Sequence, residues 1–169
     1  MHTEPLLGLD VASLSIVFLV LLGIHVSAAL AAIASGLVAM FSRKGSSRHL
    51  VGGRVYFGAI LIVFSSACAM SAFRWPTDLP LVATGAVAAV AATYGFIYRR
   101  LRRPGDAPHI IAMGVSYVAM LTAFYVDNGP QLPIWQLLPS WLFWFLPAIV
   151  GTPLIVRAVV RRRHHQPWN

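Results

Sequence analysis

Charged side chains are scarce in this sequence. Only 11% of the residues are charged and 58% are hydrophobic, whereas about a quarter of the residues in a soluble domain are charged. A water-soluble fold of 169 residues could not hide that much apolar surface, and a lipid bilayer can accept it. The composition therefore excludes an ordinary soluble domain and favours a protein that lies within a membrane.

Acidic residues and cysteine are scarcer still. Five Asp and Glu stand against 13 Lys and Arg, which gives a net charge of +8. The basic residues form short clusters between apolar runs, a placement typical of membrane topology and not of nucleic-acid binding. We expect no carboxylate within the membrane, which disfavours an ion-coupled transporter. The single cysteine, Cys68, excludes a disulfide framework.

Five stretches reach the roughly 20 apolar residues that a helix needs to cross a bilayer. They are residues 11–41, 55–73, 79–98, 109–126 and 137–156. We predict an all-α membrane protein, a bundle of five transmembrane helices that forms one domain over residues 1–169 without an internal repeat. The first stretch lacks a charged leader and is too long for a signal-peptide core, so we expect it to be retained.

Small residues and prolines predict how these helices pack. Ala28, Ala32 and Gly36 follow a four-residue spacing that predicts a close contact with another helix. Pro147 and Pro153 are expected to kink the fifth helix, because a proline leaves a backbone carbonyl unpaired.

The loops predict the orientation of the bundle. Twelve of the 13 basic residues fall on one side of the five helices, and Arg74 alone falls on the other, together with four of the five acids. The positive-inside rule then places the N-terminus outside and the C-terminus in the cytoplasm. We expect a multi-pass protein of the bacterial inner membrane, whose basic loops contact anionic lipid head groups at the cytoplasmic face.

His25 lies in the middle of the first helix, where an ionisable side chain is costly and is by default a functional candidate. A neutral imidazole can ligate haem iron or copper. Counting helix rise brings Met70 and Met120 to its depth, so His25, Met70 and Met120 are one hypothesis for a metal site. The alternative is a histidine that is hydrogen-bonded between helices, with methionines that fill the core.

His49 and His109 are expected at the cytoplasmic edge, His49 in a basic loop and His109 at the start of the fourth helix. Together with His25, Arg54 and Tyr117 they are the candidate cofactor-binding residues, for haem b, a quinone or copper. A depth difference of roughly 20 Å between His25 and His109 disfavours a haem held by both. The alternative for the loop is a lipid-binding basic segment.

Several short motifs resemble a known family. The first half carries residues 23–30, Gly36, Lys44-Gly45, His49 and Gly53-Arg54, and the second half carries Gly105-Asp106, His109, Met113 and Ser116-Tyr117. This pattern is similar to the bacterial membrane family called domain of unknown function 2306, over about residues 23–157. The resemblance implies a multi-helix membrane protein with recurrent histidines and leaves its activity open.

Three functions follow from these features. The leading hypothesis is a non-catalytic accessory subunit that packs against other subunits of a larger membrane complex, such as a respiratory or other redox complex. It rests on the small size, the small-residue helix faces and the lack of a nucleotide-binding or metalloprotease motif. The alternative is a redox protein that binds haem, quinone or copper, and the third is a transporter of a small solute.

Overall fold

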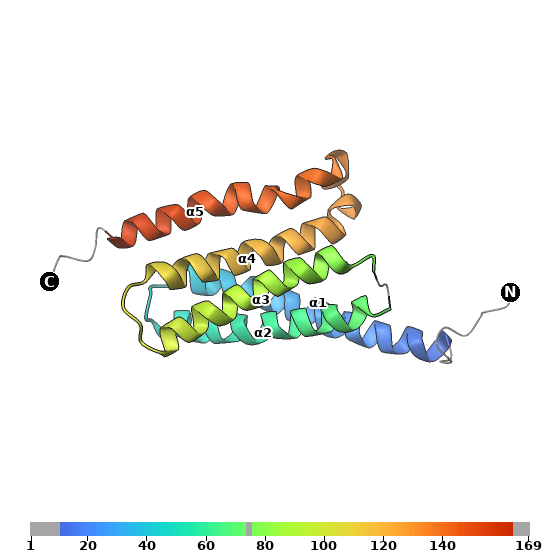
Figure 1. The fold of residues 1–169 in the computed structure, drawn as a ribbon, viewed down its shortest axis with the longest axis horizontal. Coiled ribbons are helices and arrows are strands. Elements are labelled where there is room, and N and C mark those ends of the chain that lie inside the picture. The colour runs from blue at the N-terminus through green and yellow to red at the C-terminus, as the bar shows by residue number, and fades with distance from the viewer. Residues whose placement is uncertain (1–10, 74–75, 164–169) are drawn as a thin grey trace. The chain divides into compact units, whose positions relative to one another are not determined.

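The computed structural model describes residues 11–73 and 76–163, and every regular element in these ranges is helical. Figure 1 shows the course of the chain. The α-helices are α1 (Val11–Phe41), α2 (Ser47–Ser71), α3 (Leu79–Arg100), α4 (Ala107–Asn128) and α5 (Leu146–Arg163). Three short 3-10 helices, η2 (Gly129–Gln131), η3 (Trp135–Leu137) and η4 (Ser140–Trp144), connect α4 to α5.

Five of the described segments are long and apolar enough to cross a membrane. They are Ile16–Phe41, Ser47–Ser71, Leu79–Arg100, Ala107–Gln131 and Ser140–Arg162. The prediction of an all-helical chain with five candidate spans is therefore confirmed. Its length and composition indicate a multi-pass membrane protein.

Helix α2 begins earlier than the hydropathy of the sequence predicts. The expected span starts at residue 55, whereas the helix starts at Ser47. Ser46 is its N-cap, and the Ser46 side chain accepts a hydrogen bond from the backbone N–H of His49 at 3.3 Å. Such a cap satisfies a backbone donor that the first helical turn leaves unpaired. His49 thus lies on a helix and not in a loop.

Helix α5 begins later than predicted, at Leu146 and not at residue 137. Pro139 precedes η4 and has an extended backbone, so the chain reaches α5 through 3-10 turns. Pro147 consequently lies in the first turn of α5, where its missing N–H removes no helical hydrogen bond. The expected kink at Pro147 is wrong for this reason. Pro153 does lie inside the helix.

The contacts divide the chain into two compact units, Met1–Asp78 and Leu79–Asn169, and each is described by itself. In the first unit α1 packs on α2. Ala28 and Ala32 are buried, and so are Tyr56 and Ile60 of α2. The prediction of a close helix contact along the small residues of α1 is confirmed, because small side chains let two helix backbones approach.

In the second unit α4 contacts both α3 and α5. The packing of α4 on α5 is close at Gly114 and Gly151. A Cβ atom at Gly114 would overlap the Ile155 side chain, and one at Gly151 would overlap Val118. Phe143 of η4 is almost fully buried and lies against Gly129. These contacts hold the middle of α5 and the connecting turns against α4.

Candidate functional site

His25 joins the two helices of the first unit. Its Nδ1 lies 3.1 Å from the backbone oxygen of Val63 and 3.0 Å from the Ser66 hydroxyl, both on α2. A carbonyl oxygen can only accept, so Nδ1 carries the proton and donates to it, and the lone pair of the neutral ring lies on Nε2. The half-buried His25 is therefore a hydrogen-bond donor between α1 and α2.

His49 and His109 make the same kind of bond at the start of α2 and α4. The Nδ1 of His49 donates to the backbone oxygen of Ala39 on α1 at 2.9 Å. The Nδ1 of His109 donates to the backbone oxygen of Gly95 on α3, also at 2.9 Å. Each histidine stands three residues after the N-cap of its helix. Each thus ties the first turn of one helix to the end of the helix before it.

The similarity between the two histidines extends to their surroundings. Gly45 and Gly105, which precede the two N-caps, have φ angles of 82° and 81°, a backbone conformation that glycine adopts most readily. The buried positions of α2 and α4 then follow the same pattern, each residue 60 positions after its counterpart. The buried pairs are Gly52 and Ala112, Tyr56 and Ser116, Ala59 and Ala119, and Ile60 and Met120. The pair α1 and α2 and the pair α3 and α4 therefore repeat the same local arrangement of glycine, histidine and buried residues.

Asp106 connects three segments of the second unit. Its Oδ1 accepts a hydrogen bond from Arg99 of α3 at 2.9 Å, and its Oδ2 lies 3.6 Å from the Arg162 guanidinium of α5. Asp106 is also the N-cap residue of α4, but its side chain makes no capping hydrogen bond. The carboxylate, at the start of α4, instead contacts the arginines at the ends of α3 and α5.

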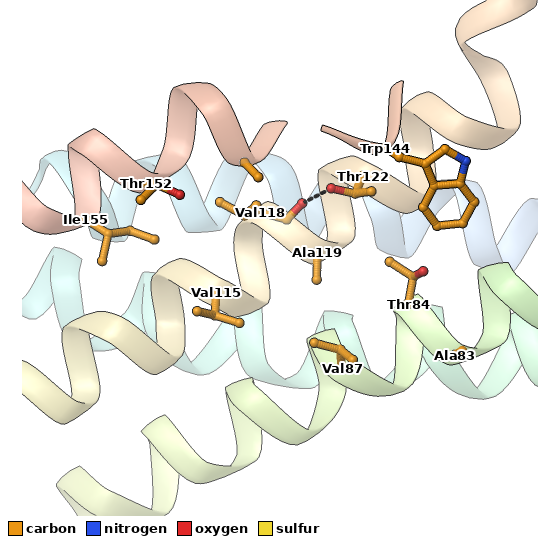
Figure 2. A pocket seen from close by; sticks show the side chains of 11 residues that line it. Ala83, Thr84, Val87, Val115, Val118, Ala119, Thr122, Trp144, Thr152 and Ile155 are labelled. Carbon is orange, nitrogen blue, oxygen red and sulfur yellow. Dashed lines mark hydrogen bonds between the residues drawn. The ribbon is translucent and has the colours of Figure 1, made fainter. Parts of the chain in front are cut away.

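A groove of about 450 Å³ lies between α3, α4 and α5 (Figure 2). Helix α4 forms its floor, α3 and α5 form its walls, and Trp144 of η4 closes one end. Its volume falls within the range of small-molecule sites, roughly 300–1,000 Å³. The lining residues are Ala83, Thr84, Val87, Val115, Val118, Ala119, Thr122, Trp144, Ala148, Thr152 and Ile155.

Two of the three threonine hydroxyls of the groove are directed to their own helices. The Thr84 hydroxyl donates to the backbone oxygen of Pro80 at 2.8 Å, and the Thr122 hydroxyl donates to that of Val118 at 2.9 Å. The second of these bonds is drawn in Figure 2. The remaining lining is mainly aliphatic. The groove thus offers an apolar surface and suits hydrocarbon better than a polar solute.

The expected metal site is divided between the two units. His25 and Met70 belong to the first unit, and the buried Met120 belongs to the second. The oxygens of Val63 and Ser66 are the atoms of α2 found at His25 Nδ1, and Met70 lies one helical turn further along α2. Within residues 11–73 and 76–163, no three His, Cys, Asp or Glu side chains form a group that could hold a metal ion. A site that combines the three residues stays a prediction.

The expected cofactor residues are likewise distributed over both units. His25, His49 and the exposed Arg54 lie in the first unit, and His109 and the half-buried Tyr117 lie in the second. Within the first unit, His25 and the Ala39 partner of His49 are 14 residues apart on α1, about 21 Å along its axis. One ligand atom could not touch both histidines. A cofactor site that combines residues of both units stays a prediction.

Sequence reasoning missed the repeated histidine site and the groove. The repeat had a readable signal, because Gly45 and His49 have the same spacing as Gly105 and His109. The groove had none, since its walls come from three helices whose packing the sequence does not reveal. Comparisons with protein-family models, with curated proteins and with solved structures find no match for this chain.

Proposed function

We propose that this chain is a non-catalytic accessory subunit of a larger membrane complex, for example a respiratory or other redox complex. The observation that carries the proposal is the use of the three histidines. His25, His49 and His109 each donate a hydrogen bond from Nδ1 to a backbone carbonyl of the neighbouring helix. The ionisable side chains most suited to chemistry therefore serve to hold helices together, as expected of a scaffold.

The same bonds favour one second candidate, a redox protein that binds haem, quinone or copper. A metal-ligating histidine usually donates its other ring N–H to a carbonyl or carboxylate, which fixes the tautomer and the orientation of the ring. Nδ1 of His25 makes a bond of this kind. The other ring nitrogen, Nε2, carries the lone pair and is the atom that would ligate a metal. His49 and His109 are oriented by carbonyls in the same way.

One preparation separates the two candidates. Wild-type protein and the variants His25→Leu and His25→Gln are purified from membranes in mild detergent, and we measure visible absorption, metal content and migration in native gels. An accessory subunit migrates with a partner well above its own mass of 18.4 kDa, and the chain separated from that partner is colourless. A reduced-minus-oxidised haem spectrum of the separated chain that His25→Leu abolishes would contradict the accessory role. So would a lone, fully active monomer.

We also propose the orientation and location that the charges favour, with the N-terminus outside, the C-terminus in the cytoplasm and the chain in a bacterial inner membrane. The support is the clustering of arginines at one set of helix ends, where anionic lipid head groups would bind them. A fluorescent protein fused to the C-terminus should fluoresce, whereas a fused alkaline phosphatase should be inactive. Membership of the domain of unknown function 2306 family is a further proposal, which rests on the short motifs around His49 and His109.

A further inference from the structure

We propose that the groove of the second unit holds one acyl chain of a membrane phospholipid, from the leaflet on the side of η4. This proposal is independent of the accessory role and concerns the lining residues alone. These residues belong to three segments that are long and apolar enough to cross a membrane. In a bilayer such a groove is occupied by another molecule. The lining residues and the dimensions of the groove indicate which kind of molecule this is.

The chemistry of the lining matches hydrocarbon. Eight of the eleven lining side chains are alanine, valine, isoleucine or tryptophan, and the other three are threonines. Thr84 and Thr122 direct their hydroxyls to carbonyls of their own helices, so an occupant need not supply hydrogen bonds to them. A polar head group in this place would lose its hydration without gaining charged or strongly polar partners. An acyl chain has no polar hydration to lose.

The groove is too small to enclose a helix of a partner protein. The lining of α5 runs from Ala148 to Ile155, about 10 Å along the axis. A helix segment of that length and about 11 Å diameter would occupy roughly 950 Å³. The groove has about 450 Å³. A partner helix could therefore lie across the groove but not within it, whereas a single extended hydrocarbon chain can lie inside.

The aromatic end of the groove indicates where the lipid enters. Trp144 extends the groove beyond Ala148 by about one further turn, to a total of ~15 Å, which is half of the ~30 Å hydrocarbon core. Trp135 and Trp141 lie in the same connecting turns. Tryptophans gather at the membrane interface, where lipid head groups begin. A lipid of that leaflet would thus place its head group near η4 and its chain along the groove.

Two phenylalanine variants test the occupancy. Ala148→Phe fills the groove from α5, and Ile149→Phe, the matched control, adds a ring at a neighbouring residue that does not line it. After exchange into mild detergent, native mass spectrometry counts the phospholipid retained by each protein. Wild type and Ile149→Phe should retain about one per chain, and Ala148→Phe about tenfold less, which corresponds to a loss of about 1.4 kcal/mol of binding free energy. Equal retention in both variants, or none in wild type, would overturn the proposal.

A second measurement does not depend on the folding of Ala148→Phe, and the variant that retains Trp144 alone keeps every residue that lines the groove. Proteins that retain Trp144 alone or Trp141 alone are placed in vesicles of phosphatidylcholine with brominated acyl chains, which quench tryptophan fluorescence on contact. Trp141 is 63% exposed and Trp144 only 39%, so random contact with lipid would quench Trp141 more. A chain in the groove instead quenches Trp144 more, about twofold or above. Stronger quenching of Trp141 would refute the proposal.

Discussion

Replacement of Gly52 by alanine is the sharpest test of the packing between α1 and α2. A Cβ atom at Gly52 would lie 3.0 Å from the backbone oxygen of Ser35 and 3.2 Å from the backbone nitrogen of Ala39. Both are backbone atoms of α1 and cannot rotate away as a side chain can. The helices would have to separate by about 0.4 Å to restore ordinary contact distances.

The separation would also weaken the hydrogen bond next to it, since His49 donates to Ala39 across the same contact at 2.9 Å. Overpacking of a tight contact costs about 1–3 kcal/mol. Alanine recovers part of this, up to about 1 kcal/mol, because it favours a helix more than glycine does. We therefore expect Gly52→Ala to lower the free energy of unfolding by about 1–2 kcal/mol.

The matched control is Gly58→Ala, on the same helix, where a Cβ atom would meet nothing within 4 Å. It should leave stability unchanged or raise it by up to about 1 kcal/mol. The assay is loss of helical circular dichroism on titration of detergent-solubilised protein with sodium dodecyl sulfate. If Gly52→Ala proves as stable as Gly58→Ala, then α1 and α2 do not approach each other closely enough at Gly52 for a Cβ atom to meet the backbone of Ser35 and Ala39.

Two further predictions concern the second unit. Gly151→Ala should destabilise the protein by about 1–3 kcal/mol, because its Cβ would overlap Val118. Val118→Ala in the same chain should restore part of the loss, and purely additive losses in the titration would count against this contact. Asp106→Asn removes both ion pairs, with Arg99 and Arg162. These groups are partly exposed, so the cost is about 1 kcal/mol or less and should shrink at high salt; a thermal midpoint difference that salt does not change would show that charge is not the cause.

The sequence alone was sufficient for the class of the fold. Long apolar runs predict membrane-spanning helices, because a backbone that crosses a bilayer can pair all of its polar groups only in a helix or a closed barrel. The first residues of α2 and α5 were less predictable, because caps and prolines next to each helix decide where it begins. Hydropathy places the start of α2 at residue 55, but the Ser46 cap starts the helix at Ser47 and carries His49 onto it. Prolines before η4 delay α5 to Leu146.

The histidines show where sequence reasoning ends. Their positions made His25, His49 and His109 candidates, since an ionisable group within a span needs a reason to be there. The sequence could not show that each donates to a backbone carbonyl of the neighbouring helix, because a carbonyl partner has no residue-specific signature. It did contain the repeated spacing of glycine and histidine, but the buried positions gave that spacing its meaning.

The groove depended on tertiary structure entirely. Alanines, valines and threonines on α3, α4 and α5 look like ordinary membrane-facing residues when each helix is read by itself. They form a groove because α3 and α5 both pack on α4, with Gly114 and Gly151 bringing α5 close. Composition and hydropathy thus determined that this chain is helical and suited to a membrane, because the solvent acts on every residue separately. Which side chains meet was decided by packing, which no single segment encodes.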